Sequence, residues 1–276
     1  MLRRKVSGFH IFNYAFLSLL ILVCIAPILH VIALSFSQKI EAVAGHVGLL
    51  PVGFNVEAYR YVMEDSQFWT SLGVTLLRVV IGVPVNIFLV VMTAYPLSKS
   101  NSRFHARTVF AWFFAFTMYF SGGQIPLYIV ISKLKMINTI WALTLPGAMN
   151  VSYMILMLNF FRGIPTEIED AATIDGANAW QKFKNITVPF LIPIITMLVI
   201  TTTKGGLTIF DYIQAMTAGG PAQSTEAIGI LIYRHAMSEG KFAQSVAESM
   251  CLFVIVAIVS FLTIKISSKK EVGDDT

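Results

Sequence analysis

The sequence predicts an all-α integral membrane protein, and three observations lead to this fold class. Hydrophobic residues make up 56% of the 276 positions and charged residues only 13%, whereas soluble domains carry about 25% charge. The mean hydropathy is +0.72. Several apolar runs reach about 20 residues, the length that a helix needs to cross about 30 Å of hydrocarbon. The 20 Lys+Arg against 15 Asp+Glu give a net charge of +5, too dilute for a nucleic-acid-binding surface.

A hydropathy window of about 20 residues finds six predicted transmembrane helices. They cover residues 14–36, 72–97, 109–131, 137–161, 187–209 and 246–264. The first run is too long for the hydrophobic region of a signal peptide, and no small-residue cleavage pattern follows it. We therefore expect it to remain as the first span.

The distribution of Lys and Arg predicts which side of the membrane each connection occupies. Twelve of the 20 lie in the two tails and in the second and fourth connections, and seven lie in the longer loops on the other side. Arg78 falls inside the second span. Because cytoplasmic loops carry the excess of Lys and Arg, both termini are predicted to be cytoplasmic.

Two outer connections, residues 37–71 and 204–245, are too long for simple turns. We expect short surface helices in the first, because residues 56–62 have an amphipathic pattern. The second contains the turn signal Gly219-Gly220-Pro221. The sequence has no visible internal repeat and no second soluble domain, so residues 1–276 are expected to form a single transmembrane domain.

The inner connection at residues 162–188 carries the most informative pattern. Thr166 is followed three positions later by Glu169, the spacing of a capping box, and Gly176 is a residue that ends helices. A helix of about ten residues between them is too short to cross the membrane, so it is expected at the inner surface. A second amphipathic stretch, with Trp180 and Phe183, leads to the fifth span. The predicted shape is a helix, a tight bend and a second helix.

The same connection resembles a known family motif. It reads Asp170-Ala171-Ala172-x3-Gly176-x9-Ile186-x-Val188-Pro189, which is similar to the EAA motif of ABC importer permeases, E-A-A-x3-G-x9-I-x-L-P. Asp170 replaces the usual Glu and Val188 the usual Leu. With six spans and cytoplasmic termini, the resemblance covers nearly the whole chain. It implies the type I ABC importer permease fold of the carbohydrate-uptake branch.

In that family the loop holds the coupling helix, which docks on a cytoplasmic ATPase subunit. The resemblance implies that the residues in contact with the ATPase are Glu169, Asp170, Ala171, Ala172, Asp175 and Gly176. The chain has no G-x4-G-K-[ST] sequence, so ATP and Mg are expected in the ATPase subunits. The chain itself is expected to bind no cofactor and to be a transporter subunit rather than an enzyme.

The resemblance also implies the partners and the location. The expected partners are a second homologous permease in a heterodimer, two cytoplasmic ATPase subunits, an extracellular or periplasmic solute-binding protein, and membrane lipid. The expected location is the bacterial cytoplasmic (inner) membrane, which the protein crosses several times. No nucleic acid is expected among the partners.

Shorter runs are similar to sugar permeases. Residues 121–126, Ser-Gly-Gly-Gln-Ile-Pro, resemble permeases for oligosaccharides, including uronate-type substrates. Residues 210–213, Phe-Asp-Tyr-Ile, together with Gly219-Gly220-Pro221, are similar to sugar permeases more generally. The resemblance therefore implies import of a carbohydrate, most specifically an oligosaccharide, and it allows an acidic one.

Polar groups at mid-span and one glycine pair are the candidates for the substrate path. These are Arg78, Asn86, Asn150, Tyr153, Gly122 and Gly123. A charge within a span faces a cavity or the bundle interior by default, and a sugar site needs hydrogen-bonding groups and aromatic faces. The alternatives are structural, because such residues also pair within a bundle or join helices by hydrogen bonds. No metal is expected, because no cluster of His, Asp and Glu is apparent.

The glycine pair in the third span has two interpretations. Gly122-Gly123 marks either a break that exposes backbone to a cavity or a close crossing of two helices. We favour the break, because Gln124 and Pro126 follow at once.

Three other functions stay open at the level of the sequence. The first is an ABC permease for a non-sugar solute. The second is a secondary transporter, which needs an ion-coupling carboxylate within a span, whereas Asp211 and Glu248 fall near span ends. The third is a membrane-embedded enzyme, which needs a His or carboxylate cluster at depth.

Overall fold

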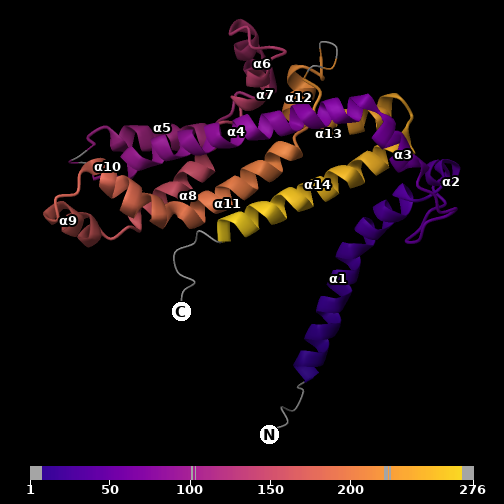
Figure 1. The fold of residues 1–276 in the computed structure, drawn as a ribbon, viewed down its shortest axis with the longest axis horizontal. Helices are drawn as coiled ribbons and strands as arrows, with labels where there is room; N and C mark the ends of the chain where they lie inside the picture. The colour runs from indigo at the N-terminus through magenta and orange to yellow at the C-terminus, as the bar shows by residue number, and fades with distance from the viewer. Residues whose placement is uncertain (1–7, 101, 103, 221–222, 224, 269–276) are drawn as a thin grey trace. The chain divides into compact units, whose positions relative to one another are not determined.

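The computed structural model describes residues 8–268 except 101, 103, 221–222 and 224. Every regular element in this part of the chain is helical, as predicted (Figure 1). The elements, with two π-helical turns labelled η, are α1 (Gly8–Ser35), α2 (Lys39–Ala44), α3 (Glu57–Glu64), α4 (Ser66–Ser98), α5 (Arg107–Tyr119), α6 (Gln124–Lys133), α7 (Ile140–Thr144), α8 (Val151–Arg162), α9 (Thr166–Ile174), α10 (Ala179–Lys182), η1 (Phe183–Thr187), α11 (Val188–Leu207), α12 (Asp211–Met216), α13 (Ile228–Tyr233), η2 (Arg234–Ser238) and α14 (Phe242–Ser268).

Four helical segments among the described residues are long and apolar enough to cross a membrane. They are α1, α4, the continuous helix Ala179–Leu207 formed by α10, η1 and α11, and Phe242–Lys265 within α14. These correspond to the first, second, fifth and sixth predicted spans. The bent pair of α5 and α6 brings the number to five when it is taken as one span. The cytoplasmic location of the termini stays a prediction.

The third predicted span, residues 109–131, is interrupted. Helix α5 ends at Tyr119, α6 begins at Gln124, and the two are bent by 116°. Gly123 has a φ of +82°, in the left-handed region that favours glycine. The break at Gly122 and Gly123 is therefore confirmed, whereas the exposure of its backbone to a cavity stays a prediction.

The fourth predicted span, residues 137–161, is not one helix. It divides into the 5 residues of α7 and the 12 residues of α8. Pro146 has no N–H with which to continue the helix, and Gly147 follows. At 1.5 Å per residue, α8 is about 18 Å long, well short of the hydrocarbon thickness. The prediction of a continuous fourth span is wrong for this reason.

The chain divides into two compact units. Unit 1 comprises Met1–Trp69 and Leu231–Val254, and unit 2 comprises Thr70–Ile230 and Ile255–Thr276. Each unit has its own buried side chains, so the two are described separately.

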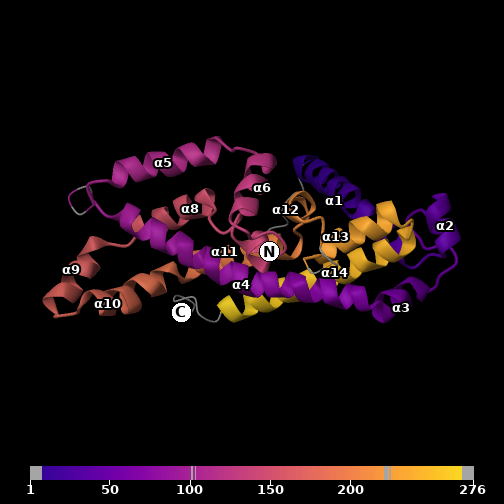
Figure 2. The same cartoon turned by 90° about the horizontal axis from the view of Figure 1, so that it is seen from above.

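A hydrophobic core of unit 2 joins α4, α8 and α11 (Figures 1 and 2). Val90 and Ala94 of α4 pack with Met157 of α8 and with Leu191 and Ile194 of α11, and all five are buried. Residues four apart lie on the same face of a helix, which explains why α4 presents Val90 and Ala94 together. This core holds the helices that line the cavity described below.

Unit 1 contains the loop between α1 and α4. Ala33 and Leu34, near the end of α1, form a small core with Ala42 and Val47. His30 in α1 is half-buried, and its Nδ1 lies 2.8 Å from the Gly48 carbonyl oxygen. The short helices expected in this loop are confirmed as α2 and α3.

Candidate functional site

A cavity of about 580 Å³ lies in unit 2, lined by α4, the segment from α7 to α8, α11 and α12. Its lining is rich in amide, hydroxyl and aromatic groups, and it includes one guanidinium and one carboxylate. The polar lining residues are Arg78, Asn86, Thr144, Asn150, Tyr153, Thr201, Thr202, Thr208, Asp211 and Tyr212. Such groups suit a polyhydroxylated ligand, because each sugar hydroxyl needs a partner when it leaves water.

Arg78 is the cation of this cavity, and backbone carbonyls hold it in place. Its Nε donates to the Leu143 oxygen at 2.8 Å, and its Nη1 donates to the Gly206 oxygen at 2.9 Å. Both carbonyls belong to the last turn of a helix, α7 and α11, where no backbone N–H remains to pair with them. The guanidinium therefore satisfies two helix ends, and it retains further N–H donors. Among the described residues, no carboxylate forms an ion pair with Arg78.

Gly206 makes this close approach of α4 and α11 sterically feasible. A Cβ atom at position 206 would lie 2.8 Å from Val79 Cγ2 and 3.3 Å from Arg78 Nη1. The first distance is below normal van der Waals contact, so any larger residue would have to displace the Val79 side chain or move α4 and α11 apart. At the adjacent Gly205, a Cβ atom would meet nothing within 4 Å.

The two asparagines of the cavity form hydrogen bonds with other residues of its lining. Asn86 Nδ2 donates to the Ala148 oxygen at 2.7 Å, and Thr202 Oγ1 donates to Asn86 Oδ1 at 3.4 Å. Asn150 is the N-cap of α8, and its Oδ1 accepts from the backbone N–H of Tyr153 at 3.2 Å. These bonds stabilise the interruption between α7 and α8, because the chain there has no helical partners for its polar groups.

The structure brings together four of the six predicted substrate-path residues, Arg78, Asn86, Asn150 and Tyr153. Gly122 and Gly123 are not among the residues that line this cavity. The role of all six in substrate passage stays a prediction. The hydroxyl groups of α11 were not among the predicted residues, although the run of Thr201, Thr202 and Thr203 within an apolar span was a visible signal.

The second candidate site is the loop that contains α9. Helix α9 covers Thr166–Ile174, and Gly176 has a φ of +81°. The Gly176 N–H donates to the Thr173 oxygen at 3.1 Å, and the Ala177 N–H donates to the Ala172 oxygen at 2.9 Å. This bond pair is a Schellman motif, which requires a left-handed residue at the position of Gly176. The predicted helix, bend and second helix are all present.

The prediction of a capping box formed by Thr166 and Glu169 is wrong. The N-cap of α9 is Pro165, and no side chain caps this end. Thr166 is instead the first helical residue, where its side chain is not placed to cap. A capping box does form one element later, where Asn178 and Gln181 exchange bonds of 2.9 and 2.8 Å at the start of α10.

Two polar contacts fix α9 to its neighbours. Lys99, just past the end of α4, donates through Nζ to Glu169 Oε1 at 3.2 Å. Lys182 of α10 donates through Nζ to Thr173 Oγ1 at 3.0 Å. Glu169 is thus engaged within the chain, whereas Asp170 is exposed.

The loop that contains α9 also exposes apolar side chains. Ile174 is 87% exposed and Trp180 is 68% exposed, and no residue of α9 is buried. Ala171, on the exposed side of α9, leaves room for another surface to approach. Exposed apolar side chains beside Asp170 are typical of a protein–protein interface.

Comparisons with known proteins identify the family. No protein-family profile matches the chain. The multiple sugar-binding transport system permease protein MsmF of Streptococcus mutans is 34% identical over 245 residues, which cover 80% of this chain and 82% of MsmF. The chain belongs to the sugar ABC transporter permeases. As a permease subunit, it is a multi-pass membrane transport protein and not an enzyme.

Two further relatives of this permease come from Bacillus subtilis. The polygalacturonan/rhamnogalacturonan transport system permease protein YtcP is 37% identical over 190 residues, 69% of this chain and 66% of YtcP. The protein LplC is 36% identical over 187 residues, 68% of this chain and 63% of LplC. The match with this permease thus spans slightly less than two thirds of the length of these two relatives.

Solved structures show the same fold. A chain from the crystal structure of a bacterial ABC transporter involved in the import of the acidic polysaccharide alginate superposes with a TM-score of 0.82 and 25% identity, covering 96% of this permease and 98% of that chain. A chain of a bacterial alginate ABC transporter, in complex with an alginate pentasaccharide-bound periplasmic protein, has a TM-score of 0.66 and 16% identity, covering 95% and 94%. The fold is that of an ABC importer permease.

Proposed function

We propose that this permease forms part of the translocation path of an ATP-driven importer for an acidic oligosaccharide, and that the cavity around Arg78 lies on that path. The observation that carries the proposal is the setting of Arg78, a cation held by two neutral carbonyls in a polar cavity. A guanidinium presents a planar fork of donors that matches a carboxylate, and the pair gains strength in a partly dehydrated site. A neutral sugar requires no such charge.

The names of two similar proteins support an acidic substrate. YtcP is named for polygalacturonan and rhamnogalacturonan, and one structural neighbour for the acidic polysaccharide alginate. Galacturonan and alginate both carry one carboxylate per uronate unit. A fixed cation in the cavity of this permease is complementary to such a chain.

A mechanical link supports a role for α9 in coupling. Helices α10, η1 and α11 form one continuous helix, Ala179–Leu207, directly after the bend at Gly176. The far end of that helix supplies Thr201, Thr202 and Gly206 to the cavity. A displacement of α9 by an ATPase subunit is therefore transmitted along a rigid helix to the cavity wall.

The remaining parts of the proposed importer follow from the family. The partners are a second homologous permease, two cytoplasmic ATPase subunits that hold ATP and Mg, and an external solute-binding protein, in a bacterial cytoplasmic membrane. The exposed face of α9, with Asp170, Ala171 and Ile174, docks in a groove of the ATPase, as amphipathic helices do on their partners.

Transport by the reconstituted complex tests this function. The full permease is co-expressed with the second permease and the ATPase subunits of the proposed importer. The complex is placed in proteoliposomes, and the solute-binding protein is added. Uptake and ATP hydrolysis are then compared for an oligogalacturonate and a malto-oligosaccharide of equal length. We expect the acidic oligosaccharide to be taken up and to stimulate ATP hydrolysis. Uptake of the neutral oligosaccharide alone would contradict the acidic substrate, and failure to assemble with ATPase subunits would contradict the importer.

A further inference from the structure

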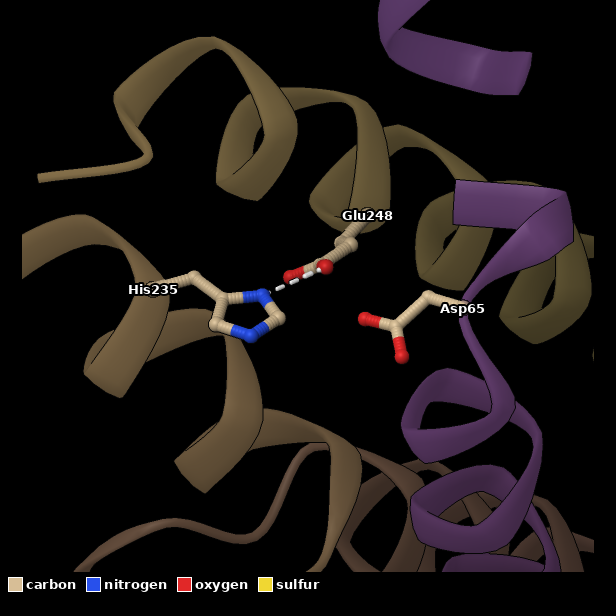
Figure 3. Close-up of side chains that lie close together, drawn as sticks. All are labelled: Asp65, His235 and Glu248. Carbon is tan, nitrogen blue, oxygen red and sulfur yellow. Dashed lines mark hydrogen bonds and ion pairs between the residues drawn. The ribbon is translucent and has the colours of Figure 1, made fainter. Parts of the chain in front are cut away.

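A cluster of metal-ligand side chains lies in unit 1, whereas the cavity and the coupling loop belong to unit 2. Asp65 lies between α3 and α4, His235 lies in η2, and Glu248 lies on α14. Each offers one ligand atom, and the three atoms all lie within 4.8 Å of one another. Figure 3 shows the three side chains turned toward one another. His235 is 1% exposed and Glu248 is 0% exposed, so most of the cluster is shielded from water.

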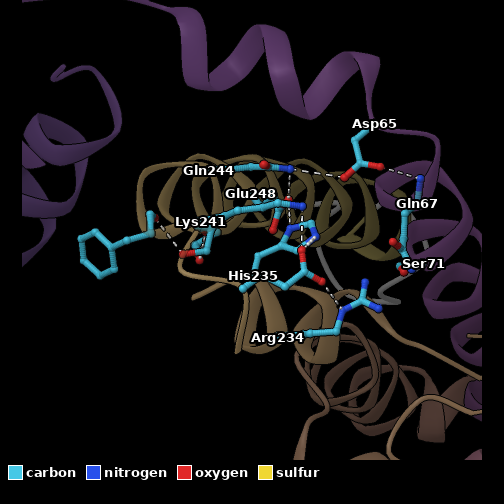
Figure 4. A network of polar contacts seen from close by, with 12 residues as sticks. Asp65, Gln67, Ser71, Arg234, His235, Lys241, Gln244 and Glu248 are labelled. Atoms are coloured by element: carbon cyan, nitrogen blue, oxygen red, sulfur yellow. Dashed lines mark hydrogen bonds and ion pairs between the residues drawn. The ribbon is translucent and has the colours of Figure 1, made fainter. Parts of the chain in front are cut away.

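The hydrogen bonds of the cluster leave one buried carboxylate oxygen unsatisfied. His235 Nδ1 lies 2.7 Å from Glu248 Oε1. Gln244 Nε2 donates to Glu248 Oε1 at 3.1 Å and to Asp65 Oδ2 at 3.3 Å (Figure 4). Glu248 Oε2 is buried and has no hydrogen-bond partner among the described residues. A buried carboxylate oxygen without a partner is costly, so its presence indicates that a further group binds there.

The charges of the cluster also favour a cation. Asp65 and Glu248 together carry two negative charges when ionised, and one imidazole balances at most one of them. The nearby Lys241 and Arg234 both form ion pairs with Glu239, at 2.6 and 3.4 Å. A divalent cation bound to both carboxylates and a neutral imidazole would make the buried group neutral.

We propose that Asp65, His235 and Glu248 bind a divalent transition-metal cation, for which Zn²⁺ is the best match. Zinc is bound by His nitrogen and carboxylate oxygen at about 2.0–2.2 Å, whereas Mg²⁺ and Ca²⁺ take oxygen ligands almost entirely. Tetrahedral bonds of that length place ligand atoms about 3.4 Å apart. The three atoms lie at most 4.8 Å apart, and rotation of the half-buried Asp65 side chain can close the remaining gap.

The surrounding side chains contact the ligand groups and can hold them in position. His235 Nε2 lies 3.8 Å from Glu239 Oε2, so the nitrogen opposite the ligand atom faces a carboxylate, as metal-bound histidines usually do. Gln244 orients both ligand carboxylates. A cavity of about 560 Å³, lined in part by Asp65, His235 and Gln244, gives a route for the ion. The bound ion would join the start of α4 to η2 and α14.

Zinc binding by the full chain, purified in detergent, is the test. The protein is stripped with a chelator, incubated with Zn²⁺, desalted and assayed for metal content and thermal unfolding. We expect about one zinc per chain and a higher unfolding temperature, because a ligand that binds only the folded state stabilises it. Mg²⁺ at the same concentration should give neither effect. A chain that retains no zinc would overturn the proposal.

Matched variants locate the site. Asp65→Asn removes a ligand carboxylate but keeps the oxygen that accepts the Gln67 N–H at 2.9 Å, so the start of α4 stays capped. His235→Asn removes the imidazole. Each should weaken zinc binding by more than the roughly 10–100-fold that loss of an outer-shell partner causes.

The control is His46→Asn, because His46 Nδ1 also contacts a carboxylate, Glu41, at 2.9 Å, but on the exposed surface. The control should bind zinc as the wild type does. If His235→Asn fails to fold, Asp65→Asn alone decides. Unchanged zinc binding in Asp65→Asn, or loss of zinc in His46→Asn, would place the metal elsewhere and refute this site.

Discussion

Lys99 Nζ lies 3.2 Å from Glu169 Oε1, and this contact joins the end of α4 to the first turns of α9. The two side chains are 24% and 25% exposed, so water screens the pair only in part. Lys99 also lies over the Tyr95 ring, 4.8 Å from its centre. Helix α9 is therefore connected to two helices that line the cavity. The Lys99–Glu169 contact connects it to α4, and the continuous helix that follows the bend at Gly176 connects it to α11.

Reversal of the Lys99 and Glu169 charges tests the first connection. Lys99→Glu places two carboxylates together, so we expect lower stimulation of ATP hydrolysis by substrate-loaded binding protein. The double variant Lys99→Glu/Glu169→Lys should recover much of it, because attraction is restored. An ion pair of this kind contributes up to about 1 kcal/mol, so a several-fold effect is expected. Equal defects in the single and double variants would mean that the pair does not act in coupling.

Asp170 tests the docking of α9 on the ATPase. The Asp170 side chain is exposed, and it forms no ion pair with any residue that the structure describes. Asp170→Lys should weaken co-purification of the ATPase subunits at moderate salt, because like charges in an interface cost several kcal/mol. Glu64→Lys on α3 is the control for a change of net charge and should leave the ATPase stoichiometry unchanged. Full ATPase recovery with Asp170→Lys would show that the carboxylate faces solvent in the complex.

Gly176 tests the bend after α9. A Cβ there would meet nothing within 4 Å, so the effect of a substitution comes from the φ of +81° alone. We expect Gly176→Val to insert normally but to lose stimulation of ATP hydrolysis, because a β-branched residue disfavours this conformation by about 1–2 kcal/mol or more. Gly176→Asn should retain more activity, since asparagine tolerates it. Equal activity of the two variants would contradict a backbone requirement.

Gly206 tests the contact between α4 and α11. Gly206→Ala places a methyl group 2.8 Å from Val79 Cγ2, so we expect a lower unfolding temperature, equivalent to about 1–3 kcal/mol. Gly205→Ala is the matched control, because the same methyl group meets nothing within 4 Å. Thermal unfolding of the two purified variants in detergent makes the comparison. Equal unfolding temperatures would show that the two helices have room to accept the methyl group.

Local patterns in the sequence predict the long helices and the coupling loop best. Long apolar runs are sufficient to place α1, α4, α11 and α14, because a span of this kind depends on the composition of its own residues. Gly176 lies six residues after Asp170 in the motif, and α9 ends just before this glycine, as predicted. The left-handed backbone at Gly176 is a property of the residue itself, so a local pattern is enough to find it.

Features that depend on the rest of the fold are harder to predict. Residues 137–161 were predicted as one span because their overall hydropathy outweighs the break at Pro146 and Gly147. Asn86 of α4 stabilises that break through the Ala148 carbonyl, a contact that no local pattern reveals. Glu169 was expected to cap α9, but Lys99 from another part of the chain binds it instead.

The cluster of Asp65, His235 and Glu248 could not be seen in the sequence, and no metal site was expected there. Positions 65 and 235 are far apart in the chain, and only the fold brings their side chains together. The cavity is an intermediate case. Its polar mid-span residues were visible one by one, but their convergence depends on how α4, α8 and α11 pack.

The most direct test of the central claim compares two substrates that differ in charge and otherwise only by one methyl group per uronate unit. An oligogalacturonate and its methyl ester have the same length and ring stereochemistry, and only the former carries carboxylates. Uptake of each is measured in proteoliposomes for the wild-type complex and for Arg78→Gln, with assembly and unfolding temperature checked on the same preparations.

We expect the wild type to favour the acidic oligosaccharide by about tenfold or more, equivalent to about 1.4 kcal/mol for a charge-assisted pair. Arg78→Gln should remove most of that preference while the complex still assembles, and Arg78→Lys should recover part of it. An unchanged preference in Arg78→Gln would contradict the account, because the guanidinium would then not meet the substrate carboxylate.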